Sequence, residues 1–215
     1  MIRHCFSRFL TQRLLIQFSR GPLPARLAGW ALAGAAVQLA LLASTALLPL
    51  PALAQAGNAQ ALERRVKAAF LYKFLAYAEF PAGAFSDSAA PVTIGVIGSD
   101  EMAAELARVV AGRQALGRPI QVRSLREGEP GTPVHLLFVA GSDNARAARI
   151  LRGAPGALMA VTECELGLQY GSVINFRIIE DRVRFDVSLD SAEKNNVKLS
   201  SRLLTVANRV IKGAS

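Results

Sequence analysis

Cysteine and histidine are scarce in this sequence, which restricts the chemistry it can support. The 215 residues include two cysteines and two histidines, and Cys5 and His4 lie close to the N-terminus. Only Cys164 and His135 occur later in the chain. A metal centre needs a cluster of His, Cys and acidic ligands, and a disulfide within one chain needs two thiols. The sequence therefore predicts no metal site and no intrachain disulfide in its main part.

Motifs for the common enzyme reactions are also missing. There is no Gly-x-Ser-x-Gly nucleophile elbow. The run from Gly95 to Gly98 lacks the third glycine of a dinucleotide fingerprint and the Lys-Ser/Thr pair of a P-loop, so a tight turn explains it better. His135 lies within an apolar run and is more typical of a structural histidine than of a catalytic base. We predict no catalytic residue, no cofactor and no enzyme activity.

Acidic residues are absent from the first part of the chain. Residues 1–54 contain five arginines, and an apolar run covers residues 30–50. Ala52 and Ala54 follow this run, and they are the small residues that signal peptidase accepts before its cleavage site. We therefore predict that residues 1–54 form a cleavable signal peptide and that the mature protein lies outside the cytoplasm.

An uncleaved membrane anchor is the alternative for this segment. The apolar stretch 31–48 has the minimum length for a helix that spans a bilayer. It also contains the polar residues Gln38, Ser44 and Thr45. The processing pattern around Ala54 favours cleavage.

The high net charge belongs largely to the same segment. Lys and Arg number 25 against 16 acids, which gives a net charge of +9. Without the five arginines of residues 1–54, the basic count falls to 20 and the net charge to +4. No cluster of basic and aromatic residues remains, so we predict no binding to nucleic acid.

The rest of the chain is predicted to comprise a short leader, residues 55–61, and a single domain, residues 62–212. Apolar runs closed by glycine are typical of strands buried on both faces of a parallel sheet, and here they alternate with helical periodicity. This alternation predicts an α/β fold with a mostly parallel sheet flanked by helices on both faces. The predicted strands are Val92–Ile97, Pro119–Leu125, Val134–Ala140 and Ala157–Val161, and the intervening helices cover residues 100–112 and 144–151.

An antiparallel hairpin is predicted near the C-terminus, at about residues 173–189. Residues 173–179 and 182–189 both alternate between apolar and polar residues, and the short link Glu180-Asp181 joins them. Because this link has no glycine, we expect a type I turn in a wider loop.

Two short helices are predicted to follow the hairpin. Asp190 to Glu193 matches a capping box at the start of the first helix, which Asn195 and Asn196 end. Ser200 or Ser201 is expected to cap the second helix. Its apolar stripe comprises Leu203, Leu204, Ala207, Val210 and Ile211.

The first helix of the domain is rich in aromatic residues and ends before Pro81. Its predicted apolar face comprises Leu62, Val66, Ala69, Phe70, Phe74 and Tyr77, and its predicted polar face comprises Glu63, Arg64, Lys67 and Lys73. Packing against the sheet explains the aromatic residues most simply. Alternatively, Tyr72 or Tyr77 lines a pocket or an interface.

Two interpretations are open for Cys164. A free cysteine is commonly a small apolar residue that is partly or fully buried. An unpaired cysteine in an exported protein also permits a disulfide to a second copy or to a partner.

Several motifs resemble the YfiR-like periplasmic family. The first is the run from Val66 to Phe74 followed by Glu79-Phe80-Pro81. The strongest are Gly171-Ser172-Val173-Ile174-Asn175-Phe176, Val183-Arg184-Phe185 and Ser200-Ser201-Arg202-Leu203-Leu204, which match the family's Gly-x-x-Ile-Asn-Phe, Val-Arg-Phe and Ser-Ser-x-Leu-Leu signatures. The resemblance covers about residues 62–211.

The resemblance implies a regulator that acts by binding. YfiR-like proteins are periplasmic α/β proteins that form dimers. The best understood member represses an inner-membrane diguanylate cyclase by binding its periplasmic sensor region, which lowers cyclic di-GMP and biofilm formation. This sequence lacks the cysteine pairs that make redox sensing plausible in that member.

The candidate residues for contact with a partner or a ligand are Tyr72, Tyr77, Asn175, Arg184, Lys198 and Ser200. Each also has a structural explanation: Asn175 bonds a neighbouring loop, Ser200 caps a helix, and Arg184 and Lys198 are solvated.

Two functions are consistent with these observations. The first is a homodimeric periplasmic repressor that binds the outer region of an inner-membrane signalling protein, a diguanylate cyclase. The alternative is a periplasmic receptor for a small molecule, which binds at the carboxyl ends of the parallel strands near Gly98 and Ser142.

Overall fold

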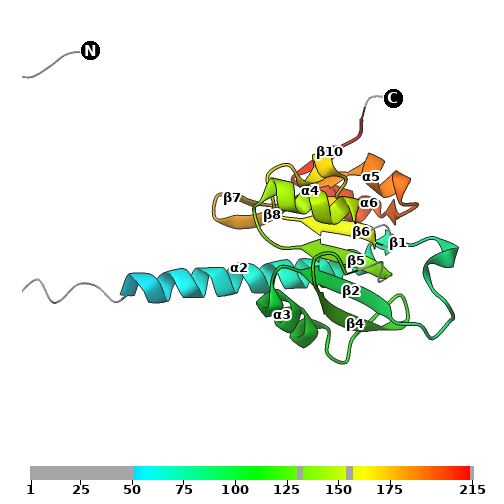
Figure 1. Ribbon diagram of the computed structural model, residues 1–215, viewed down its shortest axis with the longest axis horizontal. Coiled ribbons are helices and arrows are strands. Elements are labelled where there is room, and N and C mark those ends of the chain that lie inside the picture. Colours follow the sequence, from blue (N-terminus) through cyan, green and yellow to red (C-terminus); the bar gives the residue numbers. More distant parts are fainter. Residues whose placement is uncertain (1–50, 130–132, 154–156, 214–215) are drawn as a thin grey trace, which may run out of the picture. The chain divides into compact units, whose positions relative to one another are not determined.

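The computed structural model describes residues 51–129, 133–153 and 157–213. This part of the chain forms a mostly parallel eight-stranded sheet with helices, and a separate antiparallel sheet of two strands (Figure 1). The predicted α/β fold class is therefore confirmed. Residues 1–50 of the predicted signal peptide lie outside the described residues, and cleavage stays a prediction.

The strands of the large sheet lie in the order β10-β8-β7-β6-β5-β2-β4-β3. Strands β4, β2, β5, β6 and β7 are parallel, whereas β8 pairs antiparallel with β7 and β3 pairs antiparallel with β4. The predicted strands and hairpin are confirmed, with ends that differ by at most one residue. The bounds are β2 Val92–Ile97, β3 Gln114–Ala115, β4 Arg118–Leu125, β5 Val134–Val139, β6 Ala157–Thr162, β7 Ile174–Ile179, β8 Arg182–Ser188 and β10 Arg209–Ile211.

Strand β5 is buried on both of its faces, as its apolar sequence predicted. Leu136 and Phe138 belong to the cluster that includes α2 (Pro51–Ala76) and α3 (Asp100–Val110). Leu137 and Val139 belong to a second cluster that includes α4 (Asn144–Arg152). Because successive side chains of a strand point to opposite faces, these two clusters lie on opposite sides of the sheet.

Helix α2 differs from its prediction in both its start and its buried face. The helix already includes residues 55–61, and Leu62 on the predicted apolar face is 63% exposed. Lys67 on the predicted polar face is only 7% exposed. The buried stripe runs from Lys67 and Ala68 through Leu71, Phe74 and Leu75 to Ala78. This stripe has helical spacing as well, and it buries two leucines that the predicted stripe leaves out.

Phenylalanines join α2 to the hairpin. The ring of Phe74 lies 5.9 Å from Phe70, 5.8 Å from Phe176 in β7 and 5.0 Å from Phe185 in β8, measured between centroids. Phe70 also contacts both hairpin rings. The aromatic residues of this helix therefore pack against the sheet, as the simpler interpretation held.

The hairpin turn is tighter than predicted. Ile179 pairs directly with Arg182, so the turn has Glu180 and Asp181 as its two central residues. Their φ angles are +49° and +56°, as a type I′ turn requires. The predicted wider loop is wrong because a type I′ turn matches the right-handed twist of the strands, and this match favours it even without glycine.

The start of α5 (Leu189–Lys194) also differs from its prediction. Ser188 caps this helix, because its hydroxyl oxygen accepts a hydrogen bond from the backbone N–H of Ser191. Asp190 is already inside the helix, and its carboxylate accepts from the N–H of Gly213 at 2.6 Å. The predicted capping box at Asp190 is therefore wrong.

The last helix is shorter than predicted. Ser200 caps α6, Ser201–Val206, as expected. The chain then leaves the helix, because Asn208 bonds Phe185 through its backbone and Asp186 through its side chain. Residues 209–211 consequently form strand β10, parallel to β8, in place of the predicted last turn of helix. The two-stranded sheet pairs β1 (Ala78–Glu79) with β9 (Lys198–Leu199).

Candidate functional site

The carboxyl ends of β2, β5 and β6 meet at one edge of the sheet. From β2 the chain passes through α3 to β4 on one side, whereas β5 lies on the other side of β2. Open α/β sheets bind ligands at such a reversal of strand order. Gly98 and Gly141 follow β2 and β5 with φ angles of +91° and +105°, which favour glycine. The segments that follow these two strands turn side by side, and Ala140 N donates to Ile97 O at 2.9 Å.

A pocket of about 250 Å³ lies at this edge. Helix α2 contributes Glu63, Arg64 and Lys67 to its lining. Met102 of α3 and Phe138 of β5 supply apolar surface. The further lining residues are Gln60, Ser99, Ala140 and Glu163. The pocket thus combines charges of both signs with apolar contacts, as small-molecule sites commonly do.

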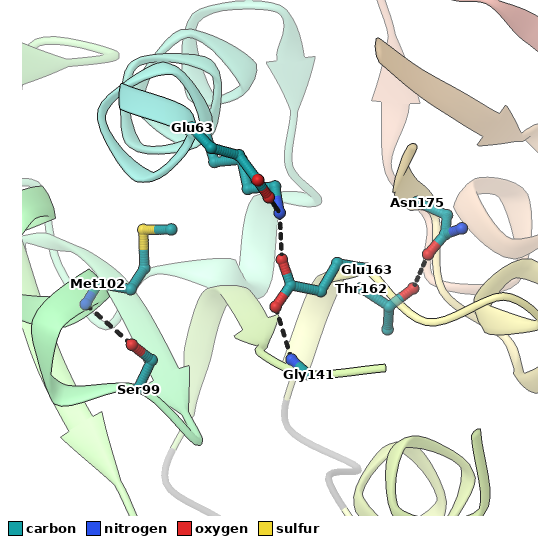
Figure 2. Close-up of polar contacts among 8 residues, drawn as sticks. Glu63, Ser99, Met102, Gly141, Thr162, Glu163 and Asn175 are labelled. Atoms are coloured by element: carbon teal, nitrogen blue, oxygen red, sulfur yellow. Dashed lines mark hydrogen bonds and ion pairs between the residues drawn. The ribbon is translucent and has the colours of Figure 1, made fainter. Parts of the chain in front are cut away.

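Lys67 joins α2 to the strand ends in this pocket. Its Nζ donates to Glu163 Oε2 at 2.6 Å and also pairs with Glu63, one helical turn earlier. The other oxygen of Glu163 accepts from the N–H of Gly141 at 2.6 Å, as the dashed lines around Glu163 in Figure 2 show. One buried lysine and two carboxylates therefore connect α2 to the loops that follow β5 and β6.

Burial and ion pairing act on Lys67 in opposite directions. Burial is the largest influence and lowers the pKa, but the hydrogen bonds and charges of Glu163 and Glu63 together outweigh it. The pKa of Lys67 is raised above its usual 10.5. A raised pKa in the folded state stabilises the fold below pH 10.5, and this contribution is lost as the pH rises through the folded pKa.

A second pocket, of about 630 Å³, lies beside Gly98 on the α4 side of the edge. Arg146 is its central cation: Nη1 donates to Ala140 O at 2.7 Å, and the guanidinium also pairs with Glu127. This ion pair holds the pKa of Glu127 below its usual range. Ser99 caps α3 by accepting from Met102 N at 3.1 Å, so the start of this helix already has an internal partner.

Comparison with known protein families identifies the chain. A family model described as YfiR/HmsC-like matches residues 64–208. The chain belongs to the YfiR/HmsC-like family. This match confirms the resemblance seen in the sequence motifs. No curated protein matches the chain.

Members of the YfiR/HmsC-like family are periplasmic regulators rather than enzymes. Across residues 51–129, 133–153 and 157–213, no helix has the length and apolar character that a membrane span needs. The same residues contain no grouping of three or more His, Cys, Asp or Glu side chains that could hold a metal ion.

The family's Ile-Asn-Phe motif has a structural role in this YfiR/HmsC-like chain. Asn175 is 2% exposed, and its Oδ1 accepts from the hydroxyl of Thr162 at 2.6 Å (Figure 2). The Thr162 hydroxyl also lies 3.0 Å from that of Ser172. A side chain at Gly167 would meet Thr162 Oγ1 at 2.0 Å, so the packing requires glycine there. Asn175 therefore bonds neighbouring residues, as the structural interpretation held.

Three other candidate residues lie together at the far end of α2. Tyr77 and Ser200 are joined through their backbones, because Ser200 N donates to Tyr77 O at 2.9 Å. Lys198 pairs in register with Glu79 in the small sheet and is exposed. Tyr72 lies apart from them, under the guanidinium of Arg113 at 5.2 Å from the ring centroid. No described contact joins these residues to the pocket of Lys67, and a contact role for them stays a prediction.

Arg184 lies on the exposed part of the β7–β8 hairpin. It stands opposite Arg177 in the register, and both side chains reach solvent. Asp186 of the same strand pairs with Asn208 and Arg209. A contact role for Arg184 stays a prediction.

Cys164 is buried, with 1% of its surface exposed, and it packs in the cluster beneath α4. Burial raises the pKa of its thiol, which lowers its reactivity. These observations favour the apolar-residue interpretation over a disulfide to a second chain. The homodimer that the resemblance implies stays a prediction.

The ion pairs of Lys67 were missed in the sequence, where this lysine was assigned to the solvent face. One signal was present: Lys67 precedes Leu71, Phe74 and Ala78 at helical spacing, and Glu63 lies one turn before it. Its distant partner Glu163 could not be inferred, because the pairing depends on how α2 packs over the strand ends.

Proposed function

We propose that this YfiR/HmsC-like chain represses an inner-membrane signalling protein, a diguanylate cyclase, by binding its periplasmic region. Membership of the family supports the regulatory part of this proposal. An exposed surface of the chain supports the second part of the proposal, that the chain binds another protein. We call it the hairpin surface, and it comprises Leu62, Arg177, Ile178, Ile179, Arg182 and Arg184.

The hairpin surface carries the proposal because it exposes aliphatic side chains. Leu62 is 63% exposed and Ile178 is 52% exposed. Ile178 lies on the same hairpin face as Phe176, and Leu62 lies two helical turns from Phe70. Phe70 and Phe176 pack together, so the exposed residues continue this contact away from the core. Hairpin and helix both extend beyond the body of the sheet (Figure 1), where they are accessible to a partner.

The charges around these aliphatic side chains indicate the chemistry of the partner. Arg177, Arg182 and Arg184 share the other face of the hairpin with Ile179, because successive side chains of a strand alternate between faces. They therefore border the exposed Ile178 from the far side of the same hairpin. Arginine is enriched in protein interfaces, where it pairs with carboxylates through two parallel hydrogen bonds. We expect the partner to present an apolar patch bordered by acidic residues.

The first test is genetic and uses the natural host of the chain. Deleting the gene should raise cellular cyclic di-GMP, measured by mass spectrometry, because the cyclase is released. The wild-type gene should restore the low level, whereas Ile178→Asp should leave it at least about threefold higher, since a charge in the centre of an interface costs more than 1 kcal/mol. Val206→Asp is the matched control, because Val206 is an aliphatic residue of α6 with similar exposure, 62%.

The possible outcomes separate the function from the surface. Unchanged cyclic di-GMP after deletion, in a host that has a candidate cyclase, contradicts repression. If deletion raises the level and Ile178→Asp restores it as well as Val206→Asp does, repression stands and the hairpin surface is wrong. Circular dichroism of both purified variants checks that they are folded.

The pocket around Lys67 favours a second candidate, a receptor for a small polar metabolite. It lies at the reversal of strand order and offers both charged and apolar contacts. A metabolite at 100 times its dissociation constant should raise the melting temperature by about 5–11 °C. A thermal-shift screen of periplasmic metabolites checks this, and a screen without any stabilising compound contradicts the receptor function.

A further inference from the structure

The segment from Pro81 to Pro91 is held against the sheet by His135, the second residue of β5. This segment includes the short 3-10 helix Ala82–Ala84 and leads into β2. His135 Nδ1 accepts a hydrogen bond from the backbone N–H of Thr93 at 3.0 Å. Its Nε2 lies 3.0 Å from the carbonyl oxygen of Ala84. These two partners require the neutral ring with its proton on Nε2, so His135 has the structural role that the sequence predicted.

Aromatic stacking strengthens this attachment. The ring of Phe85 stacks on the imidazole of His135, with centroids 4.3 Å apart and planes inclined by 19°. Phe80 meets the same imidazole edge-on at 5.7 Å. Phe80 and Phe85 flank the 3-10 helix, so the contacts of His135 reach both ends of it.

Arg118 of β4 makes a second attachment for the same segment. Its Nη1 donates to the carbonyl oxygens of Asp87 at 2.7 Å and Ala90 at 2.9 Å. Its guanidinium also lies 4.0 Å from the ring centroid of Phe85. Phe85 thus contacts both a fixed cation and the titratable ring of His135.

We propose that His135 is a pH-sensitive clasp, and that protonation of its ring releases the segment 81–91 from the sheet. Protonation places a hydrogen on Nδ1, which changes the acceptor for Thr93 N–H into a second donor. Two N–H groups then face each other, and the hydrogen bond is lost. The new positive charge also lies close to Arg118, because both cations contact the ring of Phe85. Repulsion between the two charges then weakens the attachment of the segment.

Burial lowers the pKa of His135 most, and the charge of Arg118 lowers it further, while the bond to Ala84 partly opposes them. The other charged groups of the facing elements are Asp87 of the segment and Glu79 of β1, and both are exposed. A histidine with a lowered pKa in the folded state stabilises its contacts above pH 6.5. This stabilisation is lost as the pH falls from 6.5 to the folded pKa.

The test measures the pH dependence of the segment in the full chain by NMR. Amide exchange is expressed as protection factors, which remove the intrinsic pH dependence of exchange. Between pH 7 and pH 5, protection of Thr93, whose amide donates to His135, should fall by roughly five- to twentyfold. Protection of Val173, whose amide bonds Ala160 in the centre of the sheet, should stay constant. The ring signals of His135 should titrate below pH 6.5, and their loss in His135→Asn assigns them.

Two variants test the mechanism independently of the wild-type titration. His135→Asn keeps an acceptor within reach of Thr93 but does not titrate in this range, so protection should no longer depend on pH. Arg118→Gln removes the neighbouring charge, so the ring of His135 should titrate at a higher pH. Equal protection at pH 5 and pH 7 in the wild type, or a ring that titrates at or above pH 6.5, would overturn the proposal.

Discussion

Replacing Glu63 and Glu163 together with glutamine should lower the free energy of unfolding by about 3–5 kcal/mol. The variant leaves Lys67, whose side chain is 9% exposed, without a carboxylate partner inside the protein. An unpaired buried charge must either remain at high cost or lose its proton. Urea denaturation followed by circular dichroism measures the change. Glutamine at position 163 still offers an oxygen to the N–H of Gly141, so the backbone contact is preserved.

A third substitution separates the charge from other effects. Adding Lys67→Met to the double variant removes the unpaired charge and should restore most of the lost stability, because apolar side chains of similar volume replace buried ion pairs well. Lys73→Met serves as the control, since Lys73 is an exposed lysine of the same helix, and it should change stability by less than about 0.5 kcal/mol. A triple variant as unstable as the double variant contradicts the role of the buried charge.

Phe74→Ala should lower the free energy of unfolding by about 3–5 kcal/mol. Phe74 is 1% exposed and contacts Phe70, Phe176 and Phe185. Its removal leaves a cavity between α2 and the hairpin that the neighbouring rings fill only in part. The same denaturation experiment measures this loss, with Leu62→Ala as the control on the exposed side of α2. A loss below about 1 kcal/mol would show that this cluster contributes little to stability.

The sheet could be predicted because its strands carry strong local signals. Strand β5 is apolar at nearly every position, and the alternation of β7 and β8 gives the hairpin. The short strands could not be predicted. In the sequence, Val210 and Ile211 of β10 continue the helical spacing that begins at Leu203, which predicts helix. Their pairing with β8 instead depends on the bonds that Asn208 makes to residues more than twenty positions earlier. Such pairing overrides local preference.

The site was less predictable than the fold. The sequence pointed to the strand ends near Gly98 as the position of a ligand. Pockets lie there, and ligand binding stays a prediction. The buried face of α2 was placed incorrectly, because the two candidate stripes of this helix share Phe74 and differ by a small rotation. That rotation turns Lys67 inward and Leu62 outward, so the central lysine of the pocket and one exposed leucine of the hairpin surface were both missed.

The two margins of the large sheet restrict how two copies of the protein can associate. One margin ends in β3, Gln114–Ala115, and the other in β10, Arg209–Ile211. At the first margin β3 pairs only with Arg118 and Pro119, so residues 120–125 of β4 have no strand on their outer side in the described part of the chain. At the second margin β10 offers only three residues, and Arg209 and Lys212 are paired with Asp186 and Glu193. Because unpaired backbone groups at a sheet edge are a template for another strand, pairing between the sheets of two copies is more favourable along β4 than along β10.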